Sequence, residues 1–398
     1  MKINARYLDP FIIKDLEKKM VFLGGPRQVG KTTLAKRLVS EMDPHGAYFN
    51  WDDASDRRDI RALRFPSESR WLILDEIHKF SGWRNHVKGL FDKHKERYRI
   101  LVTGSARLDY YRRGGDSLLG RYHHYRLHPF SVAELLFGNK TTVQKVPVPF
   151  QELTFPLIDA ESSTLTKSLK TFGGFPEPFL TQDLTTLRRW HLDRRERLLQ
   201  HDIRDVEILR DLNKLEVLME LLPGKVGSPF SLNSLREDLE VTHHTLSHWV
   251  DVLERFYVHF RIPPFHANTI HSLRKEPKLY LWDWSETPEG GARQENFIAS
   301  HLLKLVHFLR DADGHKTELC YIRDKEQREV DFLVTVDRRP WFAVEVKSSS
   351  DRLSKDLRYF GQRLNIPFLY QVGDNEEADV FEDGVRRMGI TRFLSGLI

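Results

Sequence analysis

The chain has 398 residues, of which 40% are hydrophobic and 30% are charged. These proportions are typical of a globular protein with two or three domains, and they exclude a disordered chain. No apolar run approaches the roughly 18 residues of a membrane-spanning helix, so we expect no membrane association. A single cysteine, Cys320, excludes a disulfide framework and a cysteine-rich metal site. With no secretion signal at the start, the sequence predicts a cytoplasmic location.

The stretch 21–33, VFLGGPRQVGKTT, contains the pattern GxxxxGK[ST] between an apolar run and a helical segment. Glycines at 25 and 30 allow backbone N–H groups to converge on phosphates, while Lys31 reaches the β- and γ-phosphates and Thr32 ligates Mg²⁺. An ordinary glycine turn is the alternative, and the flanking strand and helix disfavour it. We therefore predict that ATP or ADP binds with Mg²⁺ to the loop residues Gly25, Pro26, Arg27, Gln28, Val29, Gly30, Lys31, Thr32 and Thr33.

Two carboxylates, Asp75 and Glu76, follow the apolar run 71–74. We expect Asp75 to hold Mg²⁺, directly or through water, and Glu76 to act as the general base on the attacking water. The next apolar run, 99–103, ends at Thr103 and leads to Ser105. The hydroxyls of these two residues either sense the γ-phosphate or cap the strand. Arg121 is predicted either to stabilise the transferring phosphoryl group or to be a surface residue at the start of a strand.

Strand-like and helical patterns alternate through the first 140 residues, and this alternation predicts an α/β domain with a mostly parallel sheet. Strands are expected at 21–23, 48–51, 71–74, 99–103 and 122–127. Residues 141–215 are interpreted as a linker and helical lid region, residues 216–283 as a winged-helix domain, and residues 284–398 as a further α/β domain.

Within the predicted winged-helix domain, Ser231 and Thr242 are placed to cap helices 232–239 and 243–255. Residues 256–262 and 278–282 would form the wing. DNA-reading helices usually offer Arg, Lys, Asn or Gln to the bases. The second helix instead offers His243, His244, His248 and Trp249, which favours a structural module over a DNA reader.

In the last predicted domain, strand alternation puts Glu345 and Lys347 on one face of a strand, with Asp331 on the preceding strand. Glu295 lies near the buried face of the upstream helix 294–309. Carboxylates that converge beside a lysine are suited to metal-assisted phosphodiester hydrolysis. Glu295, Asp331 and Glu345 would hold Mg²⁺ or Mn²⁺, and Lys347 would orient the nucleophile. The alternative is a buried ion cluster in which Lys347 neutralises Glu345.

The ordered motifs GPRQVGKTT, LDEI, VTGSA, LLGRY and GGFPE resemble those of a bacterial and archaeal group of AAA-type ATPases near the STAND-like branch. Members of this group bear a C-terminal nuclease-like domain of unknown function. The pattern around Asp331, Glu345 and Lys347 likewise resembles the PD-(D/E)XK nuclease core, with its α-β-β-β-α-β element order. The resemblance also implies that Pro176, in GGFPE, contacts the adenine.

The predicted fold class is therefore an α/β P-loop NTPase of AAA type, followed by a helical and winged-helix region and a PD-(D/E)XK nuclease-like α/β domain. The predicted function is ATP hydrolysis that controls a DNA nuclease. The alternative is an ATP-controlled switch or DNA-binding scaffold whose nuclease-like domain binds without cleaving. Partners would be DNA and further copies of the chain. A small-molecule phosphotransferase is disfavoured, because the later domains would have no use in one.

Overall fold

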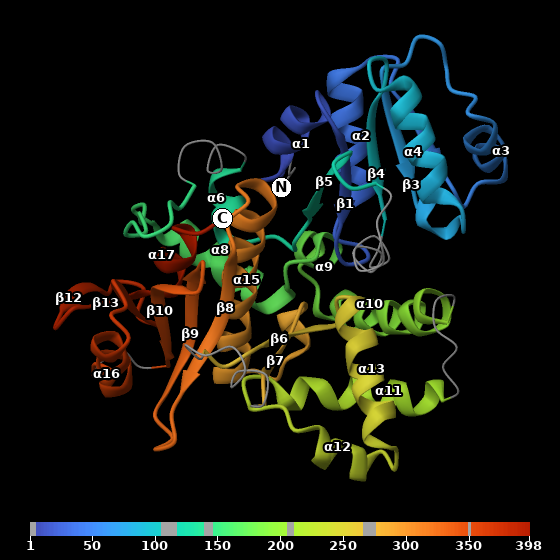
Figure 1. Ribbon diagram of the computed structural model, residues 1–398. Coiled ribbons are helices and arrows are strands. Elements are labelled where there is room, and N and C mark those ends of the chain that lie inside the picture. Colours follow the sequence, from blue (N-terminus) through green and yellow to red (C-terminus); the bar gives the residue numbers. More distant parts are fainter. Residues whose placement is uncertain (1–4, 105–117, 139–145, 205–210, 266–275, 349–351) are drawn as a thin grey trace. The chain divides into compact units, whose positions relative to one another are not determined.

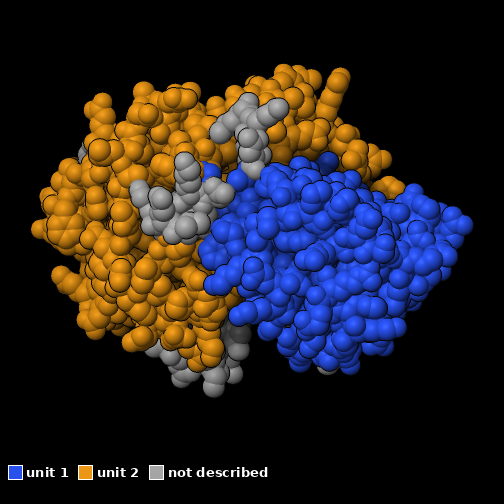
Figure 2. All heavy atoms as spheres, turned by 90° about the horizontal axis from the view of Figure 1, so that it is seen from above, with its two compact units in different colours: residues 1–128, 138–143 blue, residues 129–137, 144–398 orange. Residues whose placement is uncertain are grey.

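The computed structural model describes residues 5–104, 118–138, 146–204, 211–265, 276–348 and 352–398. The chain forms two compact units, residues 1–128 with 138–143 and residues 129–137 with 144–398 (Figure 2). Across the described ranges, no helix combines the length and apolarity needed to cross a membrane.

A five-stranded parallel sheet forms the first unit, and its strand order is β2-β3-β4-β1-β5 (Figure 1). The predicted parallel α/β sheet is thereby confirmed. Its strands are β1 (Met20–Gly24), β2 (Ala47–Asn50), β3 (Trp71–Asp75), β4 (Arg99–Thr103) and β5 (Tyr122–Arg126). The accompanying helices are α1 (Asp9–Leu16), α2 (Lys31–Met42), α3 (Ala54–Ala62), the short η1 (Ile77–Lys79) and α4 (Trp83–His94).

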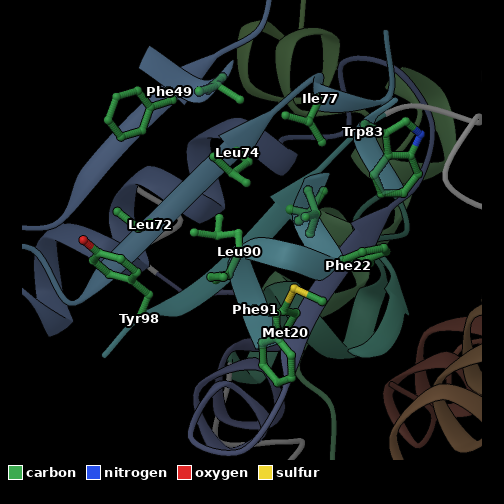
Figure 3. Close-up of a cluster of buried hydrophobic side chains, with 14 of the residues drawn as sticks. Met20, Phe22, Phe49, Leu72, Leu74, Ile77, Trp83, Leu90, Phe91 and Tyr98 are labelled. Atoms are coloured by element: carbon green, nitrogen blue, oxygen red, sulfur yellow. The ribbon is translucent and has the colours of Figure 1, made fainter. Parts of the chain in front are cut away.

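Every residue of β1 and β3 is buried, which explains why these strands are continuous apolar runs in the sequence. One face of the sheet packs against α4, where side chains of β1, β3, η1 and α4 form a common core (Figure 3). Members of this core include Met20, Phe22, Leu72, Leu74, Ile77, Trp83, Leu90 and Phe91. Because the strands are parallel, their carboxyl ends meet at one edge, where ligands of such sheets bind.

The second unit begins with α6 (Val132–Phe137), which the sequence placed with the ATPase core. Buried polar contacts explain its place: the ammonium of Lys304 lies 2.6 Å from a carboxylate oxygen of Glu134 and 2.8 Å from the hydroxyl of Ser131. The backbone N–H of Val132 donates to Nε2 of His301 at 3.1 Å. These contacts join the segment to His301 and Lys304 of the second unit, while the predicted domain boundary at residue 140 stays a prediction.

Helices dominate the following part of the second unit. They are α8 (Ala160–Phe172), α9 (Pro176–Thr181), α10 (Leu184–Arg197), the π-helical η3 (Leu198–Ile203), α11 (Leu212–Leu221) and the short η4 (Leu222–Lys225). Two further helices, α12 (Leu232–Asp238) and α13 (His243–Arg255), precede the antiparallel hairpin of β6 (His259–Ile262) and β7 (Lys278–Leu281). This is the element order expected for a winged helix.

The details of α12 and α13 differ in part from the sequence expectations. Thr242 caps α13, since its hydroxyl accepts from the N–H of Thr245 at 3.1 Å, but the side chain of Ser231 makes no capping bond to α12. Trp249, expected to be offered to a ligand, is buried because it lies on the apolar side of α13 with Leu246 and Val250.

The remaining elements build a six-stranded mixed sheet of order β12-β13-β11-β10-β9-β8. After η5 (Trp284–Glu286), they run in the order α15 (Gly291–Ala312), β8 (Thr317–Arg323), β9 (Glu329–Val336), β10 (Arg339–Lys347), α16 (Lys355–Arg363), β11 (Phe368–Gly373), β12 (Asp379–Glu382), β13 (Val385–Gly389) and α17 (Ile390–Ser395). The expected α-β-β-β-α-β order runs from α15 to β11. The sequence analysis missed the elements after β11.

Candidate functional site

The phosphate loop connects β1 to α2 at the carboxyl edge of the first unit's sheet. Gly25 has φ +139°, and a Cβ there would lie 2.5 Å from the carbonyl oxygen of Leu127, so a side chain is excluded. Gly30 adopts φ +99° as the N-cap of α2. The predicted loop residues are thus contiguous at the start of a helix, where backbone N–H groups attract anions.

Lys31 lies across the mouth of this loop. Its buried ammonium donates to the carbonyl oxygens of Gly25 at 2.9 Å and Pro26 at 2.7 Å. The loop thereby holds the lysine beside the backbone that would surround the phosphates. A phosphate is a charged acceptor and forms stronger hydrogen bonds than these neutral carbonyls.

Asp75 is the centre of a hydroxyl network at the end of β3. Its Oδ2 accepts from Thr32 at 2.8 Å and from the hydroxyl of Tyr48 at 2.8 Å, while its Oδ1 accepts from Thr103. Thr32 and Asp75, the two predicted Mg²⁺ ligands, are therefore in direct contact. Hydroxyl and carboxylate oxygens are ligands that Mg²⁺ prefers, so this pair fits the ion. Burial, together with Asp75, raises the pKa of Tyr48 and keeps its hydroxyl a donor.

Sequence reasoning missed Tyr48, although β2 was expected to end at the same edge. Thr103 donates its hydroxyl to Asp75, and its predicted role as a γ-phosphate sensor stays a prediction. Ser105 lies outside the described residues. Tyr48 and Thr103 together orient the Asp75 carboxylate.

Glu76 follows Asp75 in the left-handed backbone region, at φ 55°. Its carboxylate lies 3.5 Å from Nε2 of His78 and 3.9 Å from the ammonium of Lys79. Burial raises the pKa of Glu76, and the charges of Lys31 and Lys79 oppose that rise. Glu76 thus lies beside Lys79 and His78 and next to Asp75, the predicted metal ligand. A carboxylate in this position is suited to polarising water.

Arg121 does not join this group. It immediately precedes β5, whose residues Tyr122 to Arg126 pair in parallel with Met20 to Gly24, so it lies at the amino edge of the sheet. The phosphate loop lies at the opposite edge, about 16 Å away along a five-residue strand. Arg121 is paired instead with Asp92 at 2.7 Å. Arg121 therefore lies away from its own chain's phosphate loop, and its predicted action on a phosphoryl group stays a prediction.

Pro176 is the first residue of α9 in the second unit. The two glycines before it pack closely: a Cβ at Gly173 would lie 2.7 Å from Oδ1 of Asp283, and one at Gly174 would lie 2.5 Å from the Trp284 ring. The GGFP motif therefore has a packing role in this unit. The adenine contact of Pro176 stays a prediction.

The C-terminal carboxylates gather around the adjoining strands β9 and β10. Lys347 pairs with Glu345 at 2.6 Å, and the N–H of Val346 donates to Asp331 at 2.8 Å. Burial and the charge of Asp331 raise the pKa of Glu345 to about 7. Lys347, Arg352, Lys355, Glu345 and Asp356 line a hollow of about 500 Å³ at the start of α16. The strand geometry that the sequence predicted for Glu345 and Lys347 is present.

A lysine that the sequence analysis did not consider joins this cluster from β7. The ammonium of Lys278 lies 3.3 Å from Glu295, 2.6 Å from Glu329 and 3.6 Å from Asp331. Tyr280, two residues further on the same strand, donates to Glu295 at 2.6 Å. Strand alternation could have indicated that the side chains of Lys278 and Tyr280 share a face of β7. Nothing in the sequence indicated which carboxylates contact that face.

A divalent metal does not fit the predicted ligand set well. One observation favours it, since Oε2 of Glu345 is buried without a hydrogen-bond partner. However, Glu295 and Asp331 already share an ammonium. In the described part of the chain, only His191, Asp283 and Glu286 bring three such ligand atoms within 4.8 Å of one another. Glu286 of that group is paired with Arg194 and Arg195.

Comparison with known families covers most of the first unit and the first residues of the second. Residues 17–136 match the model of an AAA domain. This part of the chain is an AAA-type P-loop domain. Two further models, both described as domains of unknown function (DUF8612 and DUF4143), match residues 165–285 and 290–393.

Similar proteins extend over much of the chain. An uncharacterized protein of Mycobacterium tuberculosis is 24% identical over 359 residues, which are 85% of this chain and 73% of that protein. One of Methanocaldococcus jannaschii is 28% identical over 302 residues, covering 68% and 62%. Among solved structures, the Thermotoga maritima RuvB Holliday junction branch migration motor is 19% identical, covering 65% of this chain and 86% of its own. Its TM-score of 0.30 is too low for it to carry any argument.

The AAA domain therefore brings together the predicted phosphate loop, the two predicted Mg²⁺ ligands and a partly buried carboxylate at one edge of its sheet. An AAA-type ATPase fold with these groups implies a bound nucleotide together with Mg²⁺.

Proposed function

We propose that the protein hydrolyses ATP with Mg²⁺ and uses the nucleotide cycle to control how its C-terminal, nuclease-like domain engages DNA, without cleaving it. The observation that carries the ATPase proposal is the 2.8 Å hydrogen bond between Thr32 and Asp75 beside Lys31. It joins the two residues that P-loop chemistry needs around the ion, in a domain that matches an AAA model.

In this proposal, backbone N–H groups of the loop and the ammonium of Lys31 hold the β- and γ-phosphates. Thr32 and Asp75 would hold Mg²⁺, which neutralises charge on the phosphates when bound. Tyr48 and Thr103 fix the Asp75 carboxylate by hydrogen bonds. Glu76 takes the proton of the attacking water.

Replacing Lys31 by Ala is expected to weaken ATP binding at least about 100-fold, because the variant loses a charged contact to the phosphates. Isothermal titration with ATP and Mg²⁺ measures the effect. The control is Lys93→Ala, which removes an exposed lysine of α4 and should bind like the wild type. Unchanged affinity in Lys31→Ala would remove the phosphate loop from the proposal.

Arg121 would contribute to ATP hydrolysis only if two copies of the chain associate. Since it lies at the sheet edge opposite its own phosphate loop, it could act only on the nucleotide of another copy. The resemblance to the STAND-like branch and the adenine contact of Pro176 belong to the same proposal.

DNA engagement is supported by the hollow beside β10. Lys347, Arg352 and Lys355 bring three cations to the start of α16, whose N-terminus adds a partial positive charge. Cations next to a helix N-terminus suit phosphate groups. We propose that this hollow receives the DNA backbone. We propose no cleavage, because the carboxylates do not fit a metal.

Replacing Arg352 and Lys355 together by Glu is expected to weaken duplex DNA binding at least about tenfold and to reduce its salt dependence, because two phosphate contacts are lost. Fluorescence anisotropy at several salt concentrations measures both. The matched control, Lys316→Glu with Lys325→Glu, reverses two exposed lysines elsewhere. Equal losses in both double variants would show a general charge effect and contradict the hollow as the binding site.

A further inference from the structure

Lys278 is almost fully buried, with 2% of its side chain exposed, although it is a charged residue on a hairpin strand. A buried ammonium is costly unless carboxylates surround it. Here it contacts Glu329 at 2.6 Å, Glu295 at 3.3 Å and Asp331 at 3.6 Å. Burial opposes its charged form, but these carboxylates outweigh burial and raise the pKa of Lys278. Its contacts with three carboxylates hold the side chain in place as an ammonium.

The three carboxylates come from two separate elements of the C-terminal domain. Glu295 lies on α15, whereas Glu329 and Asp331 lie two residues apart on β9 and so share a face. Two of them, Glu295 and Asp331, are ligands that a nuclease-like site would give to a divalent ion. Lys278 comes from β7, which precedes that domain. Strand β7 thus places a positive charge beside the predicted ligands Glu295 and Asp331.

A second cation cannot share these carboxylates without strong repulsion. At the distances that separate Lys278 from Glu295 and Asp331, an added divalent ion would lie within a few Å of the ammonium. Two like charges at such separations repel strongly where water is excluded. The ammonium lies against all three carboxylates, and Arg323 adds a second cation 3.4 Å from Glu329.

We propose that Lys278 substitutes for a divalent metal ion in the nuclease-like site, so that Glu295, Glu329 and Asp331 are held together without metal and a metal is excluded from them. The inference rests on the nuclease-like architecture of the proposed function and deepens it. It explains how the domain retains the carboxylates of a nuclease and engages DNA without cleaving it. Glu345 and Lys347, which pair with each other, remain on the side of the DNA-binding hollow.

The test is titration of nucleotide-free, full-length protein with Mn²⁺, followed by calorimetry. Any Mn²⁺ binding by the wild type is expected to be the same in Asp331→Asn, because these carboxylates hold no ion in the wild type. Lys278→Met, which keeps the length of the side chain without its charge, is expected to bind Mn²⁺ about 100-fold more tightly, as removal of a neighbouring like charge predicts. Mn²⁺ should raise the melting temperature of Lys278→Met and leave that of wild type unchanged.

Two controls separate the outcomes. Lys278→Arg keeps the charge and should behave like wild type, and adding Asp331→Asn to Lys278→Met should remove the new binding. Wild-type binding that depends on Asp331 would overturn the proposal even if Lys278→Met failed to fold. A folded Lys278→Met that binds no Mn²⁺ would also overturn it. ATP turnover and DNA affinity, measured on the same preparations, test the proposed function separately, because neither depends on Mn²⁺ at these carboxylates.

Discussion

Replacing Glu76 by Gln is expected to slow ATP hydrolysis about 10²- to 10⁴-fold, the range lost with a general base, while ATP still binds. The amide keeps the size and shape of the side chain, but it cannot accept a proton from water. Glu76 follows Asp75 directly, and Lys31 and Lys79 contribute positive charge around it. Binding depends on the phosphate loop, which this substitution leaves intact.

Phosphate release under single-turnover conditions measures the chemical step of Glu76→Gln, and titration with ATP measures its affinity. The matched control is Glu68→Gln, which replaces a glutamate with 75% of its side chain exposed in the same unit. Turnover equal to wild type in Glu76→Gln would assign the base to another group. A parallel loss of ATP affinity would give Glu76 a role in binding instead.

Replacing Lys304 by Met is expected to lower the free energy of unfolding of the second unit by about 3–5 kcal/mol, the cost of breaking a buried ion pair. Only 2% of the Lys304 side chain and 0% of the Glu134 side chain are exposed, and their charged atoms are 2.6 Å apart. The substitution removes the ammonium that lies 2.6 Å from the buried Glu134 carboxylate. It also removes the donor to Ser131 and Pro129.

Urea unfolding followed by tryptophan fluorescence measures this loss. The double variant Lys304→Met with Glu134→Leu removes both charges and should recover most of the lost stability, because replacing a whole buried pair by apolar groups is often close to neutral. A single variant as stable as wild type would mean that the pair does not hold segment 129–137 in the second unit.

The sequence by itself predicted the motifs and strands that contiguous residues encode. Three features could be predicted because each depends on local backbone geometry or on continuous burial: the phosphate loop, the pair Asp75 and Glu76, and the buried strands. The strands of the first sheet lie close to their expected ranges for the same reason. Parallel pairing then placed Lys31 and Asp75 at a common edge.

Only the tertiary structure decided which distant side chains meet. The hydroxyl of Tyr48 on Asp75, the ammonium of Lys278 among the carboxylates and the buried pair of Lys304 with Glu134 each join residues that no spacing rule connects. Arg121 is a further example, since only the strand pairing shows that it lies at the amino edge of the sheet. Sequence patterns predict the secondary structure and burial of a segment, because these depend on residues close together in the chain. The partner of a buried charge can lie anywhere in the chain, so only the tertiary structure identifies it.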